Sequence, residues 1–130
     1  MNGGSSIVES TIHDIEAILD GDSEKLVMHA EKLGQHLGKG VSTSQIRNVF
    51  SEVKAMRSYD PHRLNLLRPK LAYTAGRHGR RKNGKLTGEI VDLQKILDHA
   101  IRKVNGEERF RNFQRFFEAI LAYHRYYGKE

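Results

Sequence analysis

The sequence predicts an all-α protein, a compact bundle of five or six helices. Three observations favour this class: apolar residues recur at helical spacing, helix start and stop signals alternate along the chain, and alternating β-branched runs are nearly absent. Only two of the 130 residues are proline, so few positions interrupt a helix. At this length we expect one helical domain, residues 6–130, after a disordered N-terminus at residues 1–5.

The first expected helix covers residues 7–20. Ser6 and Glu9 have the spacing of a capping box in front of it, in which each side chain accepts a hydrogen bond from the other residue's backbone. Gly21 supplies the glycine that commonly follows a helix end.

Two further helices are expected before residue 57. Asp22 or Ser23 caps the first of them, and the segment Gly38-Lys39-Gly40 ends it. Its inward stripe is Leu26, Ala30, Leu33 and Leu37. Ser42 and Gln45 form a second capping box, and the helix behind it turns a regular apolar stripe inward. That stripe is Ile46, Val49, Phe50, Val53 and Met56.

The second half begins with Asp60 as an N-cap and Pro61 at the first helical position. Pro69 lacks an amide donor, so we expect the helix to kink or restart there. A mobile basic loop is expected near residues 76–86, because its glycines and cations cannot build a core. Thr87 is expected to open the next helix, and a last helix carries an aromatic stripe and ends at Gly128. The inward residues of these two helices are Ile90, Leu93, Ile96, Leu97, Ala100, Ile101 and Val104, then Phe110, Phe113, Phe117, Ile120, Leu121 and His124.

The positive charge is concentrated in one third of the chain. Residues 47–85 hold eleven Lys or Arg against Glu52 and Asp60, a balance of +9, whereas the whole chain is +6. Such asymmetry predicts a polyanion-binding face, with a solvated basic surface as the alternative. Because only Tyr59 and Tyr73 are interleaved with the cations, we expect contacts with phosphates rather than bases. The candidate RNA-binding residues are Arg47, Lys54, Arg57, Arg68, Lys70, Tyr73, Arg77, Arg80, Arg81 and Lys82.

The residue types argue against an enzyme, a metal site or a cofactor. The chain has no cysteine, which excludes disulfides and thiolate chemistry and fits a cytoplasmic protein. His29 and His36 share a helix face, but no carboxylate stands at ligand spacing with both. His78 is the one candidate general base for RNA cleavage, although lone histidines are more often packed or exposed without such a role. No apolar run approaches the length of a membrane span, and no secretion signal is visible.

A helix-turn-helix protein that binds double-stranded DNA is the alternative reading. Ala30 and Gly34 have the spacing of that motif's small residue and turn glycine, and residues 45–48 would open the recognition helix. Against it, Leu37 extends the first helix past the turn, and Gly40 stands where a buried aliphatic residue belongs.

Three segments together resemble the small, all-helical subunit of type III-A CRISPR effector complexes, the Csm small subunit. They are QIRNVFSEVK at residues 45–54, LLRPKLAYTAGR at 66–77 and FQRFFEAILAYHRYYG at 113–128. The middle segment is the most specific, and the resemblance spans about residues 43–128. Small subunits of type III-B and type I complexes are also helical and basic, so they stay open as alternatives.

The resemblance implies a non-catalytic subunit of an RNA-guided interference complex. Its copies would stack as a short inner filament beside the backbone and large subunits, next to guide RNA and target RNA, with a homodimer of the isolated chain left open. Guide–target pairing supplies sequence specificity in such complexes, so phosphate contacts suffice. The basic positions within the matching segments are Arg47, Lys54, Arg68, Lys70 and Arg77, whereas Arg57, Arg80, Arg81 and Lys82 are candidates from charge alone.

Overall fold

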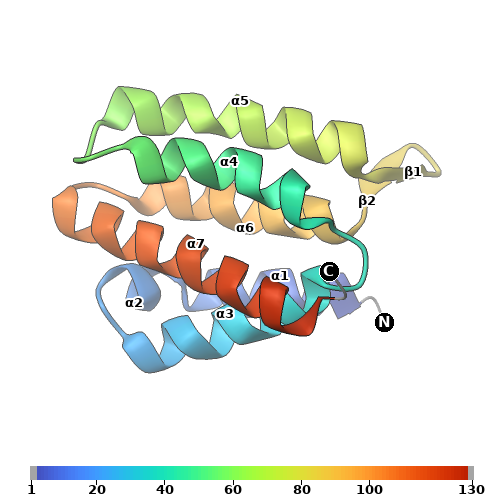
Figure 1. Cartoon of the computed structure of the whole chain (residues 1–130), viewed down its shortest axis with the longest axis horizontal. Helices are drawn as coiled ribbons and strands as arrows, with labels where there is room; N and C mark the ends of the chain where they lie inside the picture. The colour runs from blue at the N-terminus through green and yellow to red at the C-terminus, as the bar shows by residue number, and fades with distance from the viewer. Residues whose placement is uncertain (1–2, 129–130) are drawn as a thin grey trace.

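Seven helices and one short hairpin make up residues 3–128, the part of the chain that this computed structural model describes. In chain order they are α1 (Gly3–His13), α2 (Ile15–Leu19), α3 (Ser23–Leu37), α4 (Thr43–Ala55), α5 (Pro61–His78), β1 (Arg80–Lys82), β2 (Lys85–Thr87), α6 (Glu89–Lys103) and α7 (Glu107–Tyr127). Figure 1 shows α4 and α5 side by side along one edge, α6 and α7 across the middle, and α1, α2 and α3 along the opposite edge. The all-α class is confirmed, with one more helix than the largest predicted number.

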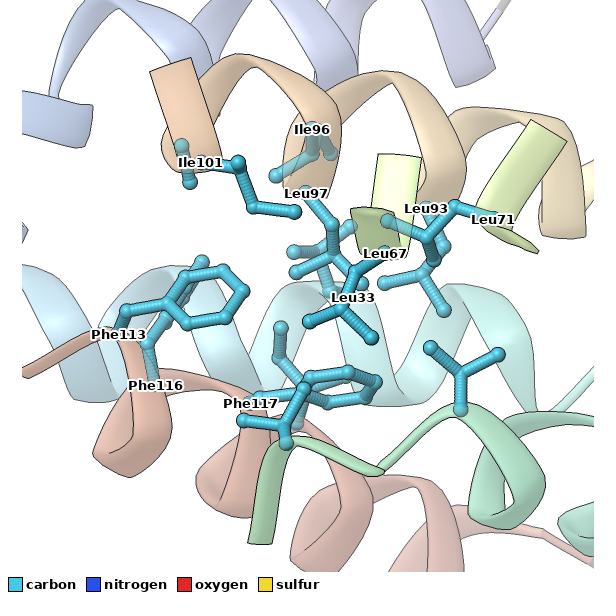
Figure 2. Packing of buried hydrophobic residues seen from close by; sticks show 14 of the residues in the cluster. Leu33, Leu67, Leu71, Leu93, Ile96, Leu97, Ile101, Phe113, Phe116 and Phe117 are labelled. Atoms are coloured by element: carbon cyan, nitrogen blue, oxygen red, sulfur yellow. The ribbon is translucent and has the colours of Figure 1, made fainter. Parts of the chain in front are cut away.

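One continuous hydrophobic core joins these layers. Leu33 of α3, Leu67 of α5, Leu97 of α6 and Phe113 and Phe117 of α7 converge on it, as Figure 2 shows, and each is at most 3% exposed. The apolar stripe predicted for α6 is buried throughout, and that of α7 is buried except for half-buried Leu121. Phe116, which the predicted stripe omitted, is also fully buried because α7 packs against both α2 and α3.

Three of the predicted helix starts are confirmed by their hydrogen bonds. Asp22 accepts from the backbone N–H of Lys25 at the start of α3. Ser42 and Gln45 form the complete capping box of α4. Asp60 accepts from two backbone N–H groups at the start of α5, where Pro61 takes the first helical position. These caps fix the residues at which α3, α4 and α5 begin. The start of a helix in turn determines which of its residues lie on the exposed face.

The first predicted helix is wrong in two respects. Its start lies at Gly3 rather than after Ser6, so the Ser6 capping box does not form, and Asp14 divides it into α1 and α2. Asp14 is held by His29 of α3, whose Nε2 lies 2.8 Å from its carboxylate. The frayed end expected at residues 1–5 falls partly on residues 1–2, outside the described chain, whereas residues 3–5 belong to α1.

The structure corrects the expected restart at Pro69 and the expected loop after it. α5 runs through Pro69 without restarting, with buried Leu67 and Leu71 anchoring it on both sides of the proline. It continues to His78, and residues 80–87 form an antiparallel hairpin whose turn, Asn83-Gly84, has positive φ at both positions. Thr87 therefore ends β2, and Gly88 precedes α6.

Among the described residues, no helix is both long and apolar enough to span a membrane.

Candidate nucleic-acid interface

The predicted RNA-binding residues lie on α4, α5 and the hairpin. α4 and α5 are antiparallel neighbours, so the start of α4 lies beside the end of α5, next to the hairpin (Figure 1). On or just after α4 lie Arg47, Lys54 and Arg57; on α5 lie Arg68, Lys70, Tyr73 and Arg77; on β1 lie Arg80, Arg81 and Lys82.

Three of these cations already have a carboxylate partner. Arg68 Nε donates to Asp98 of α6 at 2.8 Å, and its side chain is only 34% exposed. Lys70 Nζ donates to Glu52 of α4 at 2.5 Å. Arg80 lies at a longer 3.8 Å from Glu89 and keeps 72% of its side chain exposed. A phosphate that approaches Arg68 or Lys70 therefore has to compete with an existing ion pair.

The other six predicted cations form no ion pair with the described residues, and all six are exposed. They are Arg47, Lys54, Arg57, Arg77, Arg81 and Lys82. Cations without a nearby carboxylate keep their full charge for a polyanion, and exposure lets their side chains adapt to its backbone. These six are the stronger candidates for phosphate contact.

A groove runs between α4 and α5. It consists of two hollows of about 360 and 420 Å³ that share Asn48 of α4 and Tyr73 and Thr74 of α5. The hollow nearer the middle of α5 has an apolar floor from Val49, Leu67 and Pro69, with Glu52 and Lys70 at its rim. The hollow nearer the hairpin is lined by polar side chains and no carboxylate: Ser42, Ser44, Gln45, Asn48, Tyr73, Thr74, Arg77 and His78.

The contacts in the groove distinguish fixed side chains from available ones. Gln45 Nε2 lies 2.9 Å from His78 Nδ1 and ties the two helices together. Arg77 Nη1 donates to the Tyr73 hydroxyl at 3.3 Å, while the Tyr73 side chain stays 66% exposed. Asn48 is exposed and its amide has no hydrogen-bond partner among the described residues. The groove thus offers an open aromatic ring, a guanidinium and an unused amide.

The groove gathers only part of the predicted set. Lys70, Tyr73 and Arg77 line it, whereas Arg47 and Lys54 lie about 100° or more around α4 from Asn48, at about 100° of rotation per residue. The prediction from charge missed the uncharged groove residues Ser44, Gln45, Asn48 and Thr74. Their spacing could have indicated them, since Ser44 and Asn48 are one turn apart, as are Lys70 and Thr74.

Several histidines have side-chain contacts with other parts of the described chain. His29 is buried against Asp14, and His36 Nε2 lies 2.8 Å from Asp92. Burial, together with the nearby Lys103, lowers the pKa of His99. His78 faces Gln45 in the hollow nearer the hairpin, which no carboxylate lines. Within residues 3–128, no three His, Asp or Glu side chains are grouped to hold a metal ion.

The helix-turn-helix alternative does not fit the structure. Gly34 lies inside α3 and packs against α7, where an added Cβ would stand 2.5 Å from the Tyr123 Cβ. The motif needs a turn at that glycine, followed by a second helix packed on the first. α3 instead continues to Leu37, and its principal partner is α7.

The sequence of the chain matches a known protein family. The family model described as Csm2 Type III-A matches residues 20–130, which covers all three segments that resemble the Csm small subunit. No curated protein and no solved structure matches the chain. Because the matching model is that of type III-A, it favours this type over the type III-B and type I alternatives. Because it covers more than half of the chain, the protein belongs to the Csm2 family of type III-A CRISPR small subunits.

Proposed function

We propose that this protein is a non-catalytic subunit that holds guide and target RNA in a type III-A interference complex through contacts with phosphates. The observation that carries the proposal is the set of six exposed cations on or just after α4, on α5 and on the hairpin that have no carboxylate partner within residues 3–128. A phosphate backbone presents the complementary charge at regular intervals. Membership of the Csm2 family supplies the RNA-guided context.

Sequence-independent binding follows from the same surface. In an RNA-guided complex, base pairing between guide and target reads the sequence, so a subunit beside the duplex needs only backbone contacts. Side chains such as Arg81 and Lys82, on a hairpin that projects from the bundle, can reach phosphates without entering a groove (Figure 1). Contacts of this kind add affinity at every sequence.

Stacking of copies into a short inner filament is the second part of the proposal. Residues 1–46 carry seven acids and three bases, a balance of −4, whereas residues 47–85 carry +9. α1–α3 and α5 lie on opposite edges of the bundle (Figure 1). Oppositely charged edges favour head-to-tail association, which produces an open filament when the rotation between copies does not close a ring. Backbone and large subunits of the Csm complex are the other expected partners.

Matched charge removal tests the RNA contact. The double variant Arg81→Ala/Lys82→Ala removes two exposed cations from the hairpin, and Lys32→Ala/Lys95→Ala removes two exposed cations from α3 and α6. In the assembled complex, only the hairpin variant should weaken target-RNA binding, while both variants should keep the helicity of the native chain. Equal effects of the two variants would show that net charge, and not this surface, controls binding.

The non-catalytic role has its own test. A clean preparation of the full chain should leave single-stranded RNA intact with and without divalent cations. Cleavage that disappears in His78→Ala would assign the candidate general base a catalytic role and overturn this part of the proposal.

A further inference from the structure

We propose that the hairpin end of the α4–α5 groove binds one unpaired nucleotide of RNA, with its base stacked on Tyr73. The inference builds on the proposed RNA-binding function and goes beyond it, because that function requires contacts with phosphates alone. It assigns the groove a ligand of defined chemistry, a base with a free face and a free edge.

The exposed ring of Tyr73 is the first support. Its side chain is 66% exposed on α5, although large apolar rings are usually buried. It forms none of the ring–ring contacts found among the described residues, whereas Tyr123, Tyr126 and Tyr127 pack against each other at the end of α7. Among the described residues its side chain has one hydrogen bond, from Arg77 to the hydroxyl, and this bond leaves the ring face open. An open ring beside a guanidinium is the platform on which proteins stack unpaired bases.

The size and lining of the groove agree with a nucleotide. The hollow of about 420 Å³ exceeds the space of a single base and admits its ribose as well. No carboxylate lines it, so nothing in it repels a phosphate. The unpaired amide of Asn48 lies on the facing helix, where it can donate to and accept from the edge of a base. A bound base therefore gives the uncharged groove residues a binding role, which contacts with phosphates alone would not require.

The surrounding charge leads a strand toward the groove. Arg77 lines the groove itself, and Arg81 and Lys82 follow it on β1 without carboxylate partners among the described residues. At the other end, the Lys70–Glu52 ion pair joins α5 to α4 and neutralises both charges. An RNA strand whose phosphates contact the hairpin cations and Arg77 therefore reaches Tyr73 and Asn48 before it reaches the neutralised Lys70–Glu52 pair.

The alternative occupant is an apolar peptide segment of a neighbouring subunit. The adjoining hollow has an apolar floor of Val49, Leu67 and Pro69, which would suit such a segment. The hollow at the hairpin end is polar and adjoins cations, which favours a nucleotide there. The two occupants give different results with RNA that lacks bases.

The experiment compares RNA with and without bases on the full-length chain. The probes are a single-stranded uridine octamer, an abasic ribose-phosphate strand of the same length, and an RNA duplex of eight base pairs. Wild-type chain should bind the octamer about tenfold more tightly than the abasic strand, within the range expected for one base–aromatic stack. Because the chain contains no tryptophan, tyrosine fluorescence reports binding directly, and stacking should quench it.

Three variants give the proposal its control. Tyr73→Ala should lower the octamer-to-abasic ratio to about one and leave duplex affinity unchanged, while Tyr73→Phe should keep the ratio because the ring remains. Tyr126→Ala removes a tyrosine that is 76% exposed on α7 and should also keep the ratio. The inference would be overturned if Tyr73→Ala kept the wild-type ratio of octamer to abasic affinity. It would also be overturned if Tyr73→Ala lowered the affinity for all three probes equally.

The same variants distinguish a failure of the base site from a failure of the proposed phosphate contacts. If Arg81→Ala/Lys82→Ala weakens all three probes while Tyr73→Ala changes none, phosphate binding stands and the base site falls. If the hairpin variant changes no probe but Tyr73→Ala still removes the ratio, the base site stands and the hairpin loses its role.

Discussion

Gly34 and Gly76 both lie in helices, but the structure has space for a larger side chain only at Gly76. A Cβ at Gly34 would stand 2.5–2.6 Å from Tyr123 and from the backbone of His124, distances at which α3 and α7 must separate. A Cβ at Gly76 in α5 would meet nothing within 4 Å. The first glycine permits a close helix crossing, and the second only loosens a helix.

Alanine substitutions at the two positions should therefore change stability in opposite directions. Gly34→Ala should destabilise the fold by about 3 kcal/mol or more, at the upper end of overpacking effects, because backbone as well as side chain must move. Gly76→Ala should stabilise it by about 0.5–1 kcal/mol by restricting the unfolded chain. Urea denaturation measures both. Equal stabilities of the two variants would mean that α3 and α7 do not cross so closely.

Asp14 links the division between α1 and α2 to pH. The hydrogen bond with His29 lowers the pKa of Asp14 below 3.8, with a further contribution from Lys25, while burial opposes the shift. The unfolded chain then holds the proton more tightly than the folded chain. Stability from this carboxylate is therefore complete above its unfolded pKa of about 3.9 and is lost as the pH falls through the lower folded pKa.

Asp14→Asn should remove that acid-sensitive contribution. The variant should be less stable than wild type at neutral pH, and its denaturation midpoint should fall less between about pH 5 and pH 2. Glu118→Gln, at an exposed residue without an ion pair among the described residues, is the control and should keep the wild-type slope. Identical pH profiles for Asp14→Asn and wild type would show that the His29 contact does not favour the carboxylate.

Arg68 and Arg77 lie on the same helix but have different electrostatic surroundings. Arg68→Ala removes a partly exposed ion pair with Asp98 and should cost up to about 1 kcal/mol of stability. Arg77→Ala breaks no ion pair among the described residues and should leave stability nearly unchanged while weakening RNA binding more than Arg68→Ala does. Thermal denaturation and RNA titration of both variants test this. Greater loss of RNA affinity in Arg68→Ala would show that the Asp98 pair opens readily for phosphate.

At the scale of elements, the sequence predicted the local structure wherever capping and apolar spacing agreed. α4 has both a capping box and an unbroken stripe, and it was predicted correctly to within a residue at each end. The break at Asp14 could not be predicted, because no proline or glycine marks it and the contact of Asp14 with His29, 15 residues away, forms only after folding. The hairpin was missed because its strands are three residues long and four of their six residues are charged.

Pro69 shows how tertiary packing can compensate for an unfavourable residue. An internal proline removes one helical hydrogen bond and normally costs about 3 kcal/mol. Here it is exposed, and buried leucines precede and follow it within α5. Pro69 also lines the α4–α5 groove. Burial of Leu67 and Leu71 thus maintains the helix that positions Tyr73.

The candidate site was only partly predictable for a related reason. Charge density singled out the third of the chain that forms α4, α5 and the hairpin as the candidate site, because cations repel one another and stay at the surface whatever the fold. It did not show which cations meet carboxylates, since Asp98 and Glu52 approach Arg68 and Lys70 only through the packing of α5 on α6 and α4. Uncharged residues such as Asn48 became candidates only when α4 and α5 lay side by side.

For the whole molecule, phosphate contact and base stacking should separate in their response to salt. Each phosphate contact on a single strand contributes about −0.7 to the slope of log affinity against log salt, because binding releases counterions. Arg81→Ala/Lys82→Ala should therefore make the slope shallower by about 1.4. Stacking on Tyr73 releases few counterions, so Tyr73→Ala should shift the line downward and keep its slope.

The same titration tests sequence preference. Phosphates are identical at every position, and every base has a face that can stack, so two unrelated single-stranded RNAs of equal length should differ by only a few-fold. At high salt the phosphate contribution shrinks, and the advantage of the uridine octamer over the abasic strand should persist. A hundredfold preference for one sequence that survived high salt would show that hydrogen bonds to base edges select one base over the others. Asn48→Ala would then identify its origin, since Asn48 has the groove's unpaired side-chain amide.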